Sequence, residues 1–322
     1  MAGGFDLNTR RYVVPLAAQS RPTGGGTIRF DLPKTGLLAR LKLLITGSVA
    51  GTLSSPNALG MSSVVTRARL TANNGNDVWN ISGAGYHYLY RYMHNDYRDP
   101  FPASNARSAV TATTFDVSIL MDIQMNARDP MGLIMLQNDQ TLLTCSVEFL
   151  ADASVATGAT VTATVTPVME FFSVPADVKD FPDLRVIHQV LEDQVVISGA
   201  GDAVYNLPRG NTYIGLYQGL GIGASPSDAF TRARLRLNQS NFVEDHSLIP
   251  QALNVDFSEK HLNVSRPLGG IFWDFMGSSG LGTFDKFRDV INSGQFTDLA
   301  TVIAASGAGT LYNVRRQLVA LQ

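Results

Sequence analysis

Histidine and cysteine, the residue types best suited to metal binding or covalent chemistry, are few and scattered in this sequence. Cys145 is the only cysteine, so no intramolecular disulfide is possible, and the five histidines form no HxH or HExxH motif. His87 and His94 lie seven positions apart near Asp96 and Asp99, where a shared helix face could bind a metal. Ordinary polar residues around a loop are the simpler interpretation, and we expect no metal and no other cofactor.

Two further stretches match catalytic or cofactor-binding patterns only in part. Gly219 to Ala224 satisfies the dinucleotide-binding pattern GxGxxA, but Ser225-Pro226-Ser227 and another expected strand follow where that pattern requires a helix. A tight passage from strand to loop explains these glycines better. Asp245, His246 and Ser247 are adjacent, a spacing that rarely places three side chains in a catalytic relay. We therefore predict that the protein is not an enzyme.

Arginines form the most distinctive charged pattern. Two expected strands each carry arginines on one face, because alternate side chains of a strand point the same way, and another arginine pair precedes the first apolar segment. Like charges on one strand face repel unless something neutralises them. Carboxylates of a neighbouring domain or subunit, lipid headgroups, packaged nucleic acid or solvent could do so. The candidate interaction faces are Arg10 and Arg11, Arg67 and Arg69, and Arg232, Arg234 and Arg236.

The composition indicates extensive contact between subunits. The chain is 45% hydrophobic and only 16% charged, against about 25% charged for a typical soluble chain. Only five of its 25 basic residues are lysines, and arginine is favoured over lysine where protein surfaces are buried against each other. A high-GC genome would produce the same arginine bias. The net charge of −2 argues against a dedicated nucleic-acid coat, so we expect no sequence-specific nucleic-acid binding.

Neither a secretion signal nor a membrane-spanning segment is expected. Residues 1–6 lack the basic and apolar regions of a signal peptide. The longest apolar run, Leu37 to Ile45, is interrupted by Arg40 and Lys42 and is too short to span a membrane. With a single cysteine, the chain suits a reducing compartment such as the cytosol.

The chain contains a weak internal repeat. The stretch Thr-Arg-Ala-Arg-Leu occurs at 66–70 and again at 231–235, an offset of 165 (231 − 66). Upstream, Phe30–Lys34 is echoed by Tyr205–Arg209 at an offset of 175 (205 − 30). Later matches are looser: Leu142 with Leu299 at 157 (299 − 142), and Thr160–Met169 with the segment from Thr310 at 150 (310 − 160). We infer one module of roughly 150 residues present twice in tandem, with loops of different lengths.

Each module is expected to be a β-sandwich. Short segments of alternating apolar and polar residues, such as Ala159–Thr166, are bounded by Gly, Asp, Asn or Pro, and about eight such strands per module are typical of a sandwich or jelly roll. Residues 85–96, with four tyrosines, fit either a strand or a helix, and both remain open. The predicted fold class is all-β, with two tandem jelly-roll β-sandwiches and short helices in loops.

Four segments follow in order along the chain. We predict an N-terminal arm at residues 1–11, a first jelly roll at 12–173, a proline-containing linker at 174–183 and a second jelly roll at 184–322.

Two tandem β modules, a short linker, a flexible N-terminal arm, low charge and no catalytic set together resemble a double jelly-roll major capsid protein. That family forms the shells of tailless icosahedral viruses with an internal membrane, and the chain length is similar to that of corticovirus-like and finnlakevirus-like bacteriophage members. The resemblance covers the whole chain, but it is architectural, and no short motif carries it.

The resemblance implies a homotrimer whose six jelly rolls form a pseudo-hexameric capsomer of an icosahedral capsid. It implies a structural protein of the virion, assembled in the host cytoplasm, with other capsid proteins such as a penton or membrane protein and the internal viral membrane as partners. The arm would lie on the inner side, with Arg10 and Arg11 facing the membrane or interior. Loops such as Gly47 to Ser63 would form an outer tower or a contact between capsomers.

Two other functions remain open from the sequence. The chain could be another phage structural protein, such as a spike, tail or receptor-binding protein, which would form free trimers without lattice contacts. It could instead be a two-domain jelly-roll carbohydrate-binding protein. In that case Trp79 and Trp273, with the tyrosines of residues 86–92, would form a platform on which sugars stack.

Overall fold

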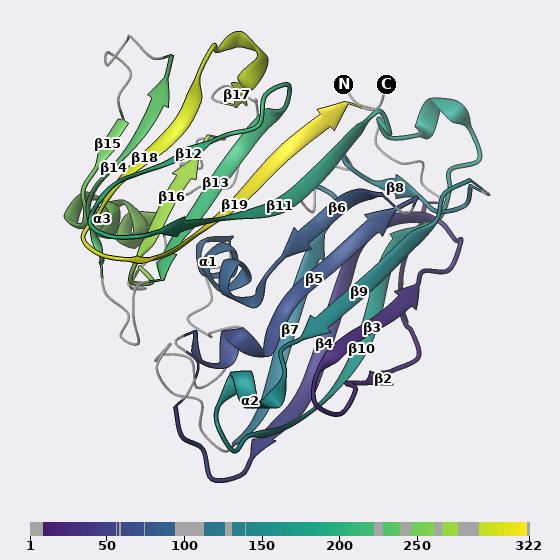
Figure 1. Ribbon diagram of the computed structural model, residues 1–322. Helices are drawn as coiled ribbons and strands as arrows, with labels where there is room; N and C mark the ends of the chain where they lie inside the picture. The colour runs from purple at the N-terminus through teal and green to yellow at the C-terminus, as the bar shows by residue number, and fades with distance from the viewer. Residues whose placement is uncertain are drawn as a thin grey trace.

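The fold is taken from a computed structural model of the chain. It describes residues 9–320 except 56, 58, 74, 94–112, 126–130, 139, 222–227, 239–245, 261–265 and 276–289. Within these residues the molecule consists of two β-sandwiches that lie side by side (Figure 1).

The first sandwich is a jelly roll of two facing sheets. One sheet has the order β1 (Arg11–Pro15), β10 (Thr160–Phe172), β4 (Leu37–Ala50) and β7 (Thr113–Asp122), with short strands β2 (Gln19–Ser20) and β8 (Ile134–Met135) attached. The other has the order β3 (Gly26–Asp31), β9 (Leu143–Phe149), β5 (Val65–Ala72) and β6 (Asn76–Ile81). Helices η1 (Gly60–Val64), α1 (Gly83–Met93) and α2 (Asp152–Val155) lie in its connections.

The second sandwich repeats this arrangement. One sheet has the order β11 (Val186–Ile197), β19 (Gly309–Ala320), β13 (Thr212–Gly221) and β16 (Gly270–Asp274), with β17 (Ile291–Asn292) attached to β13. The other has the order β12 (Gly201–Asn206), β18 (Leu299–Ala305), β14 (Phe230–Leu237) and β15 (His246–Leu248). Its helices are η2 (Val178–Asp180) before β11, α3 (Pro250–Lys260) after β15, and η4 (Ser293–Gln295) after β17.

The internal repeat is therefore a repeat of strands, and the predicted all-β double jelly roll is confirmed. Strands β3 and β12 have the same length and stand 175 positions apart (201 − 26), and β5 and β14 likewise stand 165 apart (230 − 65). The later offsets need correction. Leu143, not Leu142, is the equivalent of Leu299, because each accepts the backbone hydrogen bond that follows β3 or β12. Matching bulges align Glu170 with Arg316, an offset of 146 (316 − 170) instead of 150.

A β-bulge lies inside the repeated pentapeptide. The register of β5 against β9 shifts between Val65 and Arg67, and β14 has its bulge at the same place, after Phe230. The extra residue, Thr66, breaks the alternation of faces, so Val65 is buried in the core, although simple alternation placed it on the arginine face. From Arg67 onward the prediction is confirmed, with Ala68 buried and the arginines pointing away from the core.

Several expected boundaries differ in the structure. β4 continues to Ala50 and η1 begins at Gly60, so both ends of the expected tower loop, Gly47 to Ser63, are strand and buried helix. β11 runs without a break from Val186 to Ile197. The tyrosine segment forms helix α1, which settles the open choice. Residues 283–291, from which the sequence suggests a later element of the second roll, lie largely outside the described residues.

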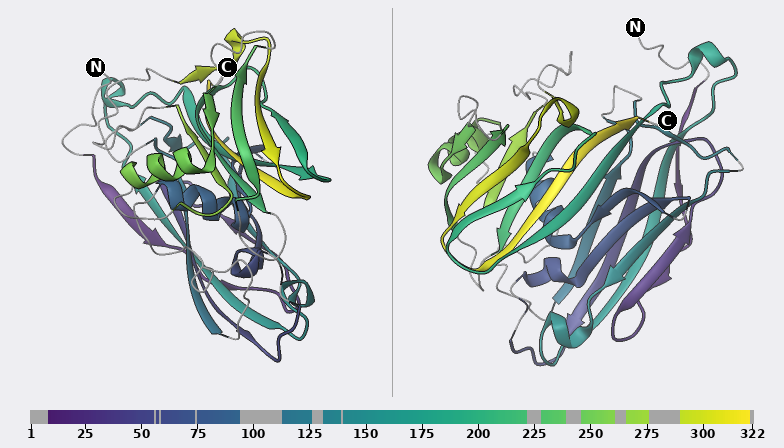
Figure 2. Two further views of the ribbon diagram at one scale, coloured as in Figure 1. Left: turned by 90° about the vertical axis from the view of Figure 1, so that its left-hand side faces the viewer. Right: turned by 45° about the horizontal axis from the view of Figure 1, so that its top comes forward.

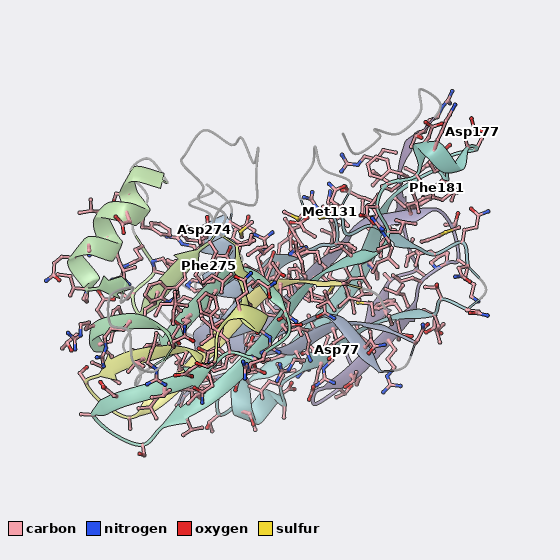
Figure 3. All side chains as sticks on the ribbon, turned by 90° about the horizontal axis from the view of Figure 1, so that it is seen from above. Asp77, Met131, Asp177, Phe181, Asp274 and Phe275 are labelled. Atoms are coloured by element: carbon pink, nitrogen blue, oxygen red, sulfur yellow. The ribbon has the colours of Figure 1, made fainter. Side chains whose placement is uncertain are left out.

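The hydrophobic core of the first sandwich extends into the second, which also has a separate core of its own. The larger cluster is centred on the first roll but also contains Tyr217, Phe272 and Val314 of the second. β6 of the first roll pairs in parallel with β11 of the second, which joins two sheets into one. Helix α1 lies between the rolls (Figures 1 and 2). The connection between the rolls, marked by Asp177 and Phe181, lies on the side of the molecule away from Asp274 and Phe275 (Figure 3).

Candidate assembly surfaces

The contact between the two rolls is made by α1 and β6 of the first against one sheet face of the second. This face is the side of the β11-β19-β13 sheet that points away from the core of the second roll, and we call it the outer face. β6 reaches its edge in parallel register, with Trp79 opposite Val190 and Asn80 opposite Leu191. Val190 and Val314 of the outer face are buried there. The outer face of the second roll is therefore interior to the molecule.

Helix α1 is held by its own roll on one side. Its first turn is closed by the hydrogen bond from the Tyr86 amide to the Ser82 carbonyl, 2.8 Å long. The Tyr86 hydroxyl donates to the Ser118 carbonyl at 3.0 Å and accepts from the Leu120 amide at 2.9 Å, so it binds the helix to β7. Burial raises the pKa of this hydroxyl well above its ordinary value, so the phenol stays neutral.

On its other side α1 packs on the second roll through two tyrosines. Tyr88 lies against Gly219 of β13, where a Cβ atom would overlap the tyrosine ring. The Tyr92 ring lies 5.0 Å from the ring of Tyr217 and 4.8 Å from that of Phe272, within the range of favourable aromatic packing. Gly219 is therefore a packing residue inside a strand, and not part of the strand-to-loop passage that the sequence indicated.

A buried carboxylate closes the contact between the rolls at the start of α1. Oε2 of Glu192, on β11, accepts hydrogen bonds from the Ser82 amide at 2.6 Å and from the Ser82 hydroxyl at 2.8 Å. Gln194 donates to the other oxygen at 2.7 Å. A Cβ atom at Gly85 would overlap the carboxylate, so glycine is required there. Burial raises the pKa of Glu192 above its ordinary value, and these hydrogen bonds oppose that rise.

The equivalent outer face of the first roll, on the β1-β10-β4 sheet, has no covering among the described residues. Val13 of β1 is 56% exposed, and Leu44 of β4, which occupies the position of Gly219, is half-buried. Glu170 of β10 is buried between two cations and forms ion pairs with Arg11 and Lys42. Burial raises the pKa of Glu170, but hydrogen bonds from these cations outweigh that effect and lower it.

The arginine faces of β5 and β14 point outward and are partly neutralised within their own rolls. Arg234 pairs with Asp202 at 2.9 Å, and Arg236 lies 2.9 Å from Asp298 in an ion pair without hydrogen-bond geometry. The other members of these faces behave differently. The Arg67 guanidinium donates to the Asn80 amide oxygen at 3.1 Å, and Arg69 and Arg232 have no ion-pair partner among the described residues.

The N-terminal arginines differ from each other. Residues 1–8 of the expected arm lie outside the described residues. The Arg10 amide donates to the Ser173 hydroxyl at 2.9 Å, and the Arg10 carbonyl accepts from the Ser173 amide at 2.8 Å. The Arg10 side chain is exposed. Arg11 begins β1 and pairs with Glu170, so its charge is already neutralised in the structure.

No protein-family model matches the chain, and no curated protein sequence matches it. Solved structures do match. The major capsid protein of Sulfolobus Turreted Icosahedral Virus is 15% identical, with a TM-score of 0.75 over 97% of each chain. The PBCV-1 virus capsid structure is 10% identical, with a TM-score of 0.64 over 98% of this chain and 95% of the other. The major capsid protein P2 of bacteriophage PM2 is 11% identical, with a TM-score of 0.57 over 97% and 98%.

The chain has the double jelly-roll fold. At these identities the similarity concerns the arrangement of strands. It spans both rolls in all three structures, so the side-by-side placement of the rolls is shared as well as the roll itself.

The double jelly roll places the residues of the carbohydrate-binding alternative inside the protein. Trp79 and Trp273 are buried, so their rings cannot stack on a sugar at the surface. Within the described parts of the chain, no group of three or more His, Cys, Asp or Glu residues could hold a metal ion. The described helices include none with the length and apolar character needed to cross a membrane.

Sequence analysis missed the residues that join the rolls, namely Tyr88, Gly219 and Glu192. In the sequence, the glycines around 219 match only a cofactor-binding pattern. A usable signal existed in α1, where Gly83 and Gly85 precede four alternating tyrosines. Small residues beside large aromatic ones are typical of a helix that packs closely against a second surface.

Proposed function

We propose that this protein is the major capsid protein of an icosahedral virus and that it self-assembles as homotrimeric, pseudo-hexameric capsomers. The observation that carries the proposal is the match of the complete two-roll arrangement, over 97% of both chains, to a viral major capsid protein. The bulk composition supports it, because only 16% of the residues are charged, as suits a chain with much of its surface buried between subunits.

The proposal includes the location and partners of the chain. It would lie in the virion shell after assembly in the host cytoplasm, next to other capsid proteins such as a penton or membrane protein, and act as a structural protein without enzymatic activity. The boundaries at 11, 173 and 183 would separate the arm, the rolls and the linker. The arm would line the interior or an internal membrane, with Arg10 as its exposed charge.

The test is the size and shape of the purified protein in solution. Light scattering coupled to gel filtration is expected to give three times the chain mass, and negative-stain images should show particles with a hexagonal outline. A monodisperse monomer would contradict the proposal. Trimers that never form sheets or shells under any assembly condition would favour a spike, tail or receptor-binding protein instead.

The role of the arm has its own test. Arg10→Glu should leave trimers intact but weaken binding to vesicles containing anionic lipid, because a positive charge that attracts such lipids is replaced by a negative one. Arg69→Glu on the arginine face of β5 is the matched control, since it makes the same charge change at another exposed position. Unchanged vesicle binding in Arg10→Glu would rule out the membrane role.

A further inference from the structure

The two surfaces that form the contact between the rolls each occur a second time on the molecule. Neither of these second surfaces has a partner among the described residues. Inside the chain, α1 and β6 of the first roll cover the outer face of the second roll. The equivalents of α1 and β6 are α3 and β15 of the second roll, and the equivalent of the covered face is the outer face of β1, β10 and β4. Figure 1 and the right view of Figure 2 place α3 on the second roll beside β14 and β15, and its Phe257 reaches the first roll, where its ring lies 6.3 Å from that of Tyr92.

The helices α1 and α3 correspond residue by residue. Each has 11 residues, and they start 167 positions apart (250 − 83). The same offset relates the hydrogen bonds that close their first turns, Tyr86 amide to Ser82 carbonyl and Leu253 amide to Ile249 carbonyl. It also relates β6 to β15, because Ala68 pairs with Ile81 as Ala233 pairs with Leu248. The two surfaces therefore share one framework.

Both open surfaces expose apolar side chains. On the second roll, Val255 of α3 is 56% exposed and Ile249, just before α3, is 46% exposed. On the first roll, Val13 and Pro15 are exposed on the outer side of edge strand β1, which pairs only with β10 among the described residues. Adjoining apolar residues on an unpaired sheet edge favour docking of another chain.

We propose that α3 and β15 of one copy dock on the outer face of β1, β10 and β4 of a second copy, in the geometry by which the two rolls of one chain already contact each other. The partner is a second copy of this chain, and the inference rests on the proposed capsomer and specifies its interface. Such a contact joins different surfaces of the two copies, so it must close into a ring or continue as a filament. Three copies would close it as a ring of six rolls.

The residues at the two contacts compensate in size. Inside the chain, the large ring of Tyr88 is received by Gly219, which has no side chain. The equivalent pair between copies is Val255, at the position of Tyr88, and Leu44, at the position of Gly219. One large and one absent side chain are replaced by two of middle size, which fills a similar volume.

The residues also compensate in polarity. Inside the chain, Ser82 donates to the Glu192 carboxylate. The equivalent pair between copies is Ile249 and Pro15, because Pro15 pairs with Val168 as Glu192 pairs with Val314. A buried polar pair is replaced by an apolar pair, so the contact between copies leaves no polar group unsatisfied at this position.

The strand register follows from the same equivalence. Val190 stands opposite Trp79 in the parallel pairing of β11 with β6. Val13 is the equivalent of Val190, and position 246 is the equivalent of Trp79. Val13 of one copy would therefore stand opposite position 246 of the next, with β1 and β15 parallel. This pairing would cover the exposed edge of β1 with backbone hydrogen bonds.

Paired cysteines test the proposed contact directly. Leu44→Cys and Val255→Cys in one chain should form a disulfide between copies under mild oxidation, which non-reducing gels would show as covalent dimers and trimers. Val204→Cys with Leu44→Cys is the matched control, since Val204 is 42% exposed on β12, outside the proposed contact. Cys145 does not interfere, because it is buried and burial raises its pKa to about 12.

A charge substitution provides the second measurement. Val255→Arg should raise the trimer dissociation constant at least tenfold, whereas Val204→Arg should leave it unchanged, with both variants folded by circular dichroism. Trimers that form no 44–255 disulfide and tolerate Val255→Arg would overturn the interface and leave the proposed capsomer standing. A wild-type chain that stays monomeric would overturn both.

Discussion

The two rolls have the same strand order, but their outer faces have different surroundings. In the second roll, Val190, Glu192 and Val314 lie on the outer face and are buried by α1 and β6. In the first roll the equivalent strands are open, with Val13 and Pro15 exposed. Burial of this face is therefore a consequence of the position of each roll in the chain, and duplication has allowed the two faces to acquire different residues.

The cores differ as well. At the centre of the second roll, Gln218 donates to the Thr301 hydroxyl at 2.9 Å and to the Asn313 carbonyl oxygen at 2.6 Å, and accepts from the Trp273 indole at 3.0 Å. The first roll has apolar residues at the equivalent positions. They are Leu43 for Gln218, Cys145 for Thr301, Met121 for Trp273 and Pro167 for Asn313.

The largest expected effect comes from giving the contact between the rolls, now Tyr88 against Gly219, the Val and Leu side chains of the contact proposed between copies. Tyr88→Val leaves a cavity between the rolls, and Gly219→Leu overfills it, so each alone should lower the free energy of unfolding by about 3 kcal/mol. The double variant restores the Val/Leu pairing proposed between copies and should cost less than either single variant. Urea denaturation of all four proteins measures the coupling. Additive losses would show that the two side chains do not share one space.

A smaller effect is expected when one core position of each roll receives the residue that the other roll has at the equivalent position. Gln218→Leu leaves the Trp273 indole and the Asn313 side chain without their buried partner, so it should destabilise the chain by about 2 kcal/mol. In the first roll, Leu43→Gln buries an amide among apolar residues and should cost at least as much. Thermal unfolding of both variants measures the losses. A neutral Gln218→Leu would show that the polar network contributes nothing to stability.

The strands of both rolls could be predicted from the sequence because their signals are local. The alternation of apolar and polar residues predicted β10, and the repeated pentapeptide predicted β5 and β14, because both signals are short sequence patterns within a single strand. The bulge at Thr66 was not predictable, because alternation carries no sign of an inserted residue. The partners of Glu192 and Gly219 lie 110 and 131 positions away (192 − 82 and 219 − 88). Such contacts require the three-dimensional arrangement of the rolls, which a single sequence does not contain.

The arginine candidates show the same limit. Spacing correctly predicted that Arg232, Arg234 and Arg236 share a face, because strand geometry fixes the direction of alternate side chains. It could not reveal that Asp202 and Asp298 approach two of them, since these acids come from other segments of the same roll. A role of the arginines in assembly stays a prediction.

Glu192 makes the contact between rolls sensitive to pH. Its pKa is raised above the ordinary 4.5 in the folded chain, so between these values the folded state holds a proton that the unfolded state has lost. Stability should therefore fall as the pH rises from about 4.5 through the raised pKa. Glu192→Gln should remove this slope, and Glu192→Ala should remove it too but be less stable than Glu192→Gln by about 1–2 kcal/mol, because Ser82 loses its partner. Urea titrations from pH 4 to 8 distinguish the three proteins, and an unchanged slope in Glu192→Gln would assign the dependence to another group.

The open face of the first roll should respond to pH in the opposite sense. The pKa of Glu170 is lowered below 4.5, so its ion pairs with Arg11 and Lys42 stabilise the folded chain fully above that pH and are lost as the pH falls through the lowered value. Arg11→Ala should cost less than 1 kcal/mol at neutral pH, because the arginine is half exposed. Hydrogen exchange of the β1 amides should accelerate in this variant while exchange in β11 stays unchanged. Equal acceleration in both strands would mean that Arg11 stabilises the whole molecule, and that the two outer faces do not respond separately despite their different surroundings.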